Sequence, residues 1–268
     1  MRLIWGMVLT VLATAGYASD LLREQRIVNE IIDGIVVGEP VWLQAGKLRF
    51  LAIHAEAERA DVRGGAIILH GRDANPTWVD VVQPLRVGLP AAGWETLSLQ
   101  LPVAAADALG AASADLIPEA FPRIAAAIDF FRQRGIVNLV LIGHSLGARM
   151  AVEYVAAEKP PEVRALVAIG LSAGRDRDRG TLAALQQIRR PLLDIYGSRD
   201  IAGVLSSAPL RAAASRRAGN SAYRQLEMAG ADHFFRGLDD TLISRVRSWM
   251  ARVAPEEALP VKREDPSE

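Results

Sequence analysis

Residues 138–157 constrain the fold most, because they join a buried strand, a sharp turn and a helix. Asn138 to Ile142 (NLVLI) is a continuous apolar run, typical of a strand that is covered on both faces of a parallel sheet. Gly143-His144-Ser145-Leu146-Gly147 follows at once, and Leu146 to Ala157 has a helical pattern. Its two glycines suit a turn at which strand and helix nearly touch. The stretch predicts an α/β fold with a strand-to-helix turn at Ser145.

The rest of the chain alternates in the same way. We expect further strands at 65–70, 95–101, 163–170, 191–196 and 223–228. We expect further helices at 77–89, 121–134, 182–188, 208–218 and 238–253, with Pro122 in the first turn of its helix. Two β-like runs between Glu39 and Phe50, around Ala45-Gly46, predict an N-terminal hairpin. The chain therefore predicts one domain over 39–253, a mostly parallel doubly wound sheet with helices on both faces.

The two ends of the chain have a different character. Arg2, the apolar run Leu3 to Leu12 and the small residues up to Ala18 predict a signal peptide over 1–18 and export to the periplasm or the medium. An uncleaved anchor or an apolar first helix are the alternatives, but the run is shorter than the ~20 residues of a membrane span. Residues 19–38 predict an amphipathic lead-in helix, and residues 254–268 a disordered tail.

Composition excludes several kinds of function. Lys plus Arg equals Asp plus Glu at 31 each, which gives no reason to expect nucleic acid as a partner. The absence of cysteine excludes thiol catalysis and cysteine-bound zinc. None of the 4 histidines is paired as in HExxH, so we expect neither a metal site nor a cofactor.

Ser145 is the candidate nucleophile, because G-x-S-x-G between a strand and a helix is the setting of a nucleophile elbow. The alternative is a structural turn with an incidental serine. A serine hydroxyl needs a base. His144 lies within the turn, His54 lies in an early strand and His70 ends another. His233 lies in a late loop after a strand, at the edge of the sheet where the turn also lies, so it is the candidate base.

The acid that orients the histidine should follow one of the last strands. Asp200 lies just beyond the strand at 191–196 and is the first candidate. Asp194 lies inside that strand and is more consistent with a buried supporting group. Asp176 and Asp178 stay open as alternatives, whereas Asp232 is too close in sequence to His233 to orient it comfortably.

Two backbone N–H groups are candidates for an oxyanion hole. One belongs to Leu146, at the start of the helix, where the helix dipole favours negative charge. The other belongs to Arg72, in the loop His70-Gly71-Arg72-Asp73 that follows the strand at 65–70. We expect His70 to hold this loop. The Arg72 side chain either faces solvent or meets an anionic substrate.

The chain resembles the α/β-hydrolase superfamily in the order of four segments along the sequence. These are the His-Gly loop, the turn at Ser145, the segment ending in Asp200 and Ala231-Asp232-His233-Phe234. The closer resemblance is to a bacterial family of unknown function with a signal peptide. The superfamily implies hydrolysis of an ester, thioester or amide through an acyl-enzyme. The family implies no substrate. Many relatives have glycine at the position of Arg72.

We therefore expect an exported serine hydrolase that acts on a small acyl substrate, without a stable membrane span. A catalytically silent binding or scaffold protein and an acyltransferase with the same triad are the alternatives. About twenty residues separate the strands at 163–170 and 191–196, which leaves no room for a large cap domain. The Ala-rich segment from Val103 to Pro118 is either a lid or a solvated surface loop.

Intact-mass measurement tests the signal peptide. The exported protein should lack the mass of residues 1–18, because a small-x-small site ends at Ala18. A mass that includes these residues would contradict the cleavage.

Overall fold

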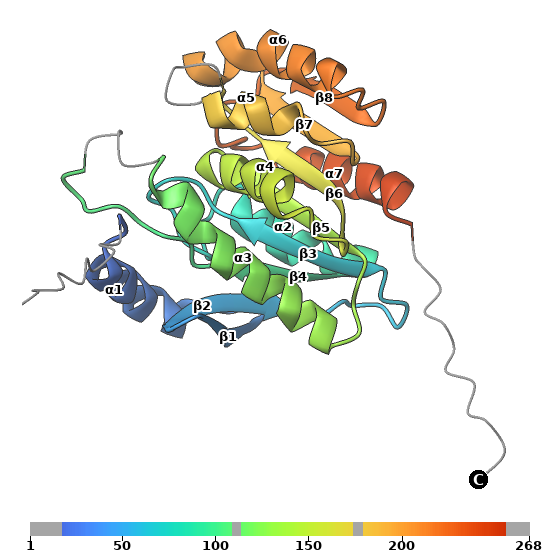
Figure 1. The fold of residues 1–268 in the computed structure, drawn as a ribbon. Helices are drawn as coiled ribbons and strands as arrows, with labels where there is room; N and C mark the ends of the chain where they lie inside the picture. The colour runs from blue at the N-terminus through green and yellow to red at the C-terminus, as the bar shows by residue number, and fades with distance from the viewer. Residues whose placement is uncertain (1–17, 109–113, 174–178, 256–268) are drawn as a thin grey trace, which may run out of the picture.

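A computed structural model describes residues 18–108, 114–173 and 179–255. These residues form one eight-stranded sheet in the order β1-β2-β4-β3-β5-β6-β7-β8 (Figure 1). The strands are β1 (Glu39–Ala45), β2 (Leu48–Ala55), β3 (Gly64–Leu69), β4 (Trp94–Leu99), β5 (Leu139–His144), β6 (Val163–Ile169), β7 (Leu192–Gly197) and β8 (Tyr223–Met228). The helices are α1 (Leu21–Ile31), η1 (Ile32–Gly34), α2 (Val82–Gly88), η2 (Pro90–Ala92), α3 (Leu116–Gln133), α4 (Leu146–Glu158), α5 (Arg179–Leu185), α6 (Ala202–Arg217) and α7 (Asp239–Val253).

The sheet is antiparallel at one edge and parallel elsewhere. β1 and β2 form the expected hairpin, in which Gly46 takes a positive φ of 60° that glycine adopts readily. β2 also pairs antiparallel with β4, and all pairs from β4 through β3 to β8 are parallel. The prediction of a mostly parallel, doubly wound sheet with an N-terminal hairpin is confirmed.

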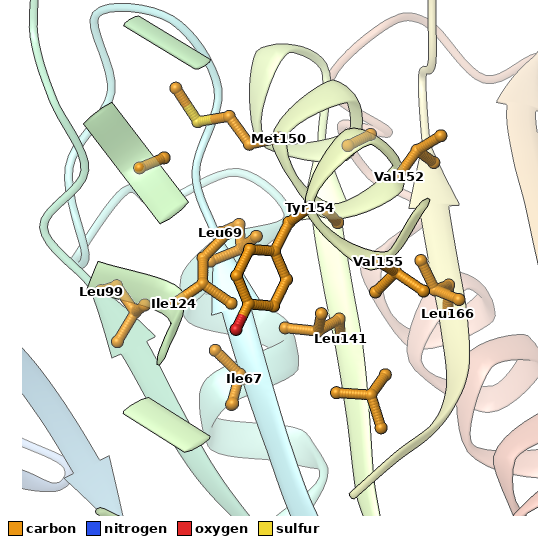
Figure 2. Close-up of a cluster of buried hydrophobic side chains, with 14 of the residues drawn as sticks. Ile67, Leu69, Leu99, Ile124, Leu141, Met150, Val152, Tyr154, Val155 and Leu166 are labelled. Atoms are coloured by element: carbon orange, nitrogen blue, oxygen red, sulfur yellow. The ribbon is translucent and has the colours of Figure 1, made fainter. Parts of the chain in front are cut away.

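Helices cover both faces of the sheet, which explains the continuous apolar strands. One apolar cluster lies between the sheet and α3, α4 and α5, and a second lies between the sheet and α2 and α7. Figure 2 shows part of the first cluster, where the Tyr154 ring of α4 stands beside Ile67, Leu69 and Leu141 of the strands. Burial raises the pKa of this tyrosine to about 12.

Four helices begin three or more residues away from the predicted start. The smallest difference is at α5, which spans Arg179–Leu185 where 182–188 was expected. α2 begins only at Val82, because the Asn75 side chain accepts the N–H of Thr77 in a turn and Val81 has a φ of 63°. α3 begins at Leu116, so Pro122 lies in the second turn and not, as predicted, in the first. α6 begins at Ala202, six residues before the expected start at 208. Buried contacts along α3 hold it in spite of its proline.

The segment from Val103 to Pro118 is held down at both of its ends. Val103 and Ala104 are buried, and the Val103 N–H donates to the Glu24 carboxylate of α1 at 3.1 Å. Arg23 of α1 donates to the Ala104 carbonyl at 2.6 Å. Residues 116–118 belong to α3, and residues 109–113 lie outside the described residues. A lid formed by the whole segment is therefore inconsistent with these contacts.

The lead-in segment contains α1, whose first turn is capped by Asp20. The Asp20 carboxylate accepts the N–H of Arg23 at 2.9 Å. Apart from Ala18, the expected signal peptide lies outside the described residues, as do residues 256–268 of the expected tail. No helix in the described ranges is long and apolar enough to cross a membrane.

Asp194 lies inside β7 and takes part in a fully buried ion pair. Its carboxylate accepts from Arg211 of α6 at 2.7 and 3.1 Å, from the Tyr223 hydroxyl at 2.6 Å and from Gln225 at 2.9 Å. Both members of the pair have side chains that are 0% exposed. The expectation of a buried supporting group agrees with this position, and the carboxylate ties α6 to the edge of the sheet.

We expect Arg211→Met to lower the free energy of unfolding by about 3–5 kcal/mol, because it leaves the Asp194 carboxylate buried without its cation. Urea unfolding followed by circular dichroism measures the change. The control Arg216→Met alters an exposed arginine of the same helix and should change stability by less than about 0.5 kcal/mol. Equal effects of the two substitutions would contradict the assignment.

Candidate active site

The turn between β5 and α4 brings main chains into contact that only glycine allows. A Cβ at Gly143 would lie 2.4 Å from the Gly147 carbonyl oxygen, and a Cβ at Gly147 would lie 2.3 Å from that of Leu69. Between them, Ser145 has φ 53° and ψ −112°, a region that residues with a side chain rarely adopt. The turn expected from the sequence is therefore present, with Ser145 at its apex.

His233, in the loop after β8, lies between Ser145 and Asp200. Its Nδ1 is 2.6 Å from Oδ1 of Asp200, and its Nε2 is 3.0 Å from the Ser145 hydroxyl oxygen. Because a carboxylate only accepts, Nδ1 carries the proton and Nε2 is free to accept from the hydroxyl. The structure thus brings together the three residues that the sequence analysis selected, although Ser145 and His233 are 88 positions apart in the sequence.

Asp200 is buried in the loop after β7 and is held by main-chain donors. Its Oδ1 also accepts the N–H of Ile201 at 2.8 Å, and its Oδ2 accepts that of Gly197 at 3.2 Å. These bonds fix the orientation of the carboxylate toward His233.

The other acids take different positions. Asp194 is bound to Arg211 in the core, as described above. Asp232 accepts the N–H groups of Phe234 and Arg236. Partial burial alone would raise the pKa of Asp232. The hydrogen bonds from the main-chain N–H groups, first that of Arg236 and then that of Phe234, outweigh this effect and lower the pKa overall. Asp176 and Asp178 lie outside the described residues.

The loop after β3 lies directly beside the turn at Ser145. A Cβ at Gly71 would lie 3.3 Å from the Ser145 Cβ, so the main chain of this loop passes close to Ser145. The side chain of Arg72 is exposed. Leu146 is the first residue of α4, so its N–H has no acceptor within the helix. Both candidate oxyanion donors therefore belong to segments that flank Ser145.

His70 holds the peptide unit that carries the Arg72 N–H. Its Nδ1 donates to the Gly71 carbonyl at 2.7 Å, and its Nε2 accepts the N–H of Leu101 at 3.0 Å. In a trans peptide the carbonyl and the N–H point in opposite directions, so the Arg72 N–H points away from His70. Burial lowers the pKa of His70 to about 4, which keeps the imidazole neutral and able to make both bonds.

The sequence analysis missed two residues that contact the triad. A Cβ at Gly170, which follows β6, would lie 2.9 Å from Cε1 of His233, so only glycine leaves space for the imidazole. The sequence could have indicated Gly170 as a site residue, because it follows the carboxyl end of a predicted parallel strand, where sites in such sheets lie. His144 was assigned to the turn alone, yet its Nε2 donates to the main-chain carbonyl of His233 at 2.9 Å.

The contacts of His54 and of the acidic residues in the described chain show whether they are further candidates. His54, in β2, pairs with Glu95 of β4 at 2.7 Å, away from Ser145. No cluster of histidine, aspartate and glutamate in the described parts of the chain could hold a metal ion.

Comparison with known proteins identifies the family. The model of a family of proteins of unknown function, DUF3530, matches residues 33–120 and 105–252, which is most of the chain. The protein belongs to the DUF3530 family. The predicted resemblance to a family of unknown function is thereby confirmed. No curated protein matches this DUF3530 chain.

Solved structures show the same fold. An esterase from Pyrococcus furiosus is 15% identical, covers 81% of this chain and 93% of its own, and has a TM-score of 0.67. An esterase domain from Rhodothermus marinus is 20% identical, with 81% and 98% covered and a TM-score of 0.61. A Xanthomonas campestris α/β serine hydrolase without a lid is 19% identical, with 83% and 98% covered and a TM-score of 0.62. The DUF3530 protein therefore has the α/β-hydrolase fold.

The lowered pKa values of two buried histidines let us predict how the free energy of unfolding depends on pH. Burial lowers the pKa of both His70 and His144 from 6.5 to about 4. Between these values the unfolded chain binds protons that the folded protein does not, so stability should fall as the pH drops from about 6.5 to about 4. Each histidine contributes up to about 1.4 kcal/mol per pH unit. Urea unfolding at a series of pH values measures the slope.

His144→Gln is the matched variant, because glutamine does not titrate in this range. Its stability should fall less steeply than that of the wild type between pH 6.5 and 4. Parallel curves for the two proteins would show that His144 does not stay neutral in the folded state.

Proposed function

We propose that this protein is an exported serine hydrolase that cleaves an ester, thioester or amide of a small acyl substrate. The observation that carries the proposal is the continuous chain of hydrogen bonds from the Ser145 hydroxyl through His233 to Asp200, over 3.0 and 2.6 Å. A hydroxyl at a strained turn, a base within reach and an acid that orients the base are the parts that nucleophilic acyl transfer requires.

The first half of the reaction forms the acyl-enzyme. Nε2 of His233 takes the proton as the Ser145 oxygen attacks the acyl carbonyl, and the Asp200 carboxylate stabilises the imidazolium. The negative oxygen that develops is held by the N–H groups of Leu146 and Arg72. The tetrahedral intermediate then breaks its bond to the leaving group, which receives the proton from His233.

The second half restores the enzyme. His233 takes a proton from water as the water oxygen attacks the acyl-enzyme carbonyl. The bond to the Ser145 oxygen breaks, the acid leaves, and His233 returns its proton to the serine. With an alcohol in place of water, the same steps give acyl transfer, and product analysis with and without alcohol acceptors separates the two activities.

Carboxylic esters of short acids are the substrates that the fold favours. Only 22 positions lie between Ile169, at the end of β6, and Leu192, at the start of β7, and they include α5, so a large cap domain has no place there. Two similar structures are described as esterases and a third as a hydrolase without a lid. These observations support a small substrate at an open site.

Export is part of the proposal and is supported by the N-terminal sequence. The positive Arg2, the apolar run and the small residues before Ser19 have the arrangement of a cleavable signal peptide. The mature enzyme would then act in the periplasm or outside the cell.

Labelling with a fluorophosphonate probe tests the nucleophile. The wild-type protein should be labelled and Ser145→Ala should not, since the probe reacts with an activated serine. Far-ultraviolet circular dichroism shows that both proteins are folded. A folded wild-type protein that takes no label would favour a non-catalytic binding or scaffold protein.

Asp200→Asn tests the acid. The substitution should lower kcat on 4-nitrophenyl acetate by about 10⁴-fold, because the amide cannot hold the imidazole in the required tautomer. Asp232→Asn is the matched control, since this neighbouring carboxylate accepts the N–H groups of Phe234 and Arg236 and pairs with the Arg236 guanidinium at 3.9 Å, without a hydrogen bond to His233 among the described residues. Its kcat should change less than about threefold. A large loss in Asp232→Asn with little loss in Asp200→Asn would refute the assignment.

A further inference from the structure

His144 is a buried histidine beside the proposed triad. Its side chain lies in the turn that carries Ser145, and the residue is only 3% exposed. The ring lies 4.9 Å from that of His233 and 5.8 Å from that of Phe234, measured between centroids. None of the catalytic steps proposed above uses this imidazole.

The hydrogen bonds of His144 fix its tautomer. Its Nε2 lies 2.9 Å from the main-chain carbonyl oxygen of His233, and a carbonyl can only accept, so Nε2 carries the proton. Its Nδ1 is buried without a hydrogen-bond partner among the described residues. Gly71 lies against this nitrogen, because a Cβ at that position would be 3.2 Å from it. The ring is thus enclosed, and its one hydrogen bond among the described residues runs from Nε2 to the His233 carbonyl oxygen.

That interaction joins the nucleophile to the base by a second route. Ser145 contacts the side chain of His233 at 3.0 Å, while the preceding residue, His144, contacts its main chain at 2.9 Å. Asp200 holds the far side of the same imidazole at 2.6 Å. The ring of His233 is therefore fixed at both nitrogens, and its backbone is fixed to the turn itself.

We propose that His144 is a positioning residue, whose Nε2–H holds the main chain of His233 so that the imidazole meets the Ser145 hydroxyl. The proposal rests on the hydrolase function proposed above. A displacement of about 1 Å between reacting groups can cost about 100-fold in rate, so a bond that fixes the base relative to the nucleophile acts on kcat. Substrate binding needs no such bond, and KM should change little.

The neutral state of His144 suits this role. Burial, and then the charge of His233, lower its pKa to about 4. The imidazole therefore keeps a proton on Nε2 alone over the pH range in which a serine hydrolase works. It also places no second positive charge against the imidazolium that forms on His233 during the reaction.

Two amide substitutions separate the hydrogen bond from the volume of the ring. In His144→Gln the side-chain amide nitrogen has about the reach of Nε2 and can donate to the His233 carbonyl. In His144→Asn the amide is one carbon shorter, has about the reach of Nδ1 and cannot. His144→Phe keeps the ring without any donor and serves as the second variant should His144→Asn fail to fold.

Steady-state hydrolysis of 4-nitrophenyl acetate and the rate of fluorophosphonate labelling measure the effect. We expect His144→Asn and His144→Phe to lower kcat and the labelling rate by about 10- to 100-fold, with KM within about twofold of wild type. His144→Gln should stay within about threefold of wild type. A folded His144→Asn or His144→Phe with unchanged kcat, or a His144→Gln as impaired as His144→Asn, would overturn the proposal.

Proton NMR separates this proposal from the hydrolase function. The Nδ1 proton of His233, held by Asp200, should give a low-field signal in the wild type and in His144→Gln, and a signal weakened by exchange in His144→Asn and His144→Phe. This readout needs no turnover. An inactive wild type with this pattern would refute the hydrolase and keep the positioning role, whereas equal signals in all folded variants would refute the positioning role.

Discussion

The main-chain contact between the start of α4 and the end of β3 is the constraint on which the site depends. Gly147 approaches the Leu69 carbonyl so closely that no side chain fits between them. This contact requires the chain to turn sharply between strand and helix. Ser145 lies at the apex of the turn and has a positive φ. Strain of this kind costs about 1–3 kcal/mol and persists only where the surrounding structure fixes it. Here the apolar packing of β3, β5 and α4 does so.

The parallel sheet places the other residues of the candidate site around that turn. Loops that follow β3, β7 and β8 all leave the sheet at its carboxyl edge, so Gly71, Asp200 and His233 lie near Ser145 although the chain separates them widely. A second glycine, Gly170, leaves room for the imidazole. Small residues thus define the shape of the site, and the polar residues supply its chemistry.

Three histidines near the turn have different environments and different roles. His70 and His144 are buried, neutral and bonded to main-chain groups, each in one fixed tautomer. His233 alone faces both a carboxylate and a hydroxyl. The site therefore contains one imidazole that lies between an acid and a hydroxyl, and two whose hydrogen bonds hold main-chain groups of the neighbouring segments.

Much of this arrangement could be predicted from the sequence, because it follows from local patterns. Apolar runs marked the strands at 65–70 and 138–142, and glycines around Ser145 marked the turn. His233 followed by elimination among few histidines. Long-range contacts could not be predicted: the pairing of Asp194 with Arg211 depends on how α6 crosses β7, and the start of α3 at Leu116 depends on buried contacts that outweigh Pro122.

The most direct test of the account is a crystal structure of the protein after reaction with a small phosphonate. It should contain a covalent bond between phosphorus and the Ser145 oxygen, with the phosphoryl oxygen within hydrogen-bond distance of the N–H groups of Leu146 and Arg72. An adduct on another residue, or a phosphoryl oxygen that faces neither N–H, would contradict it.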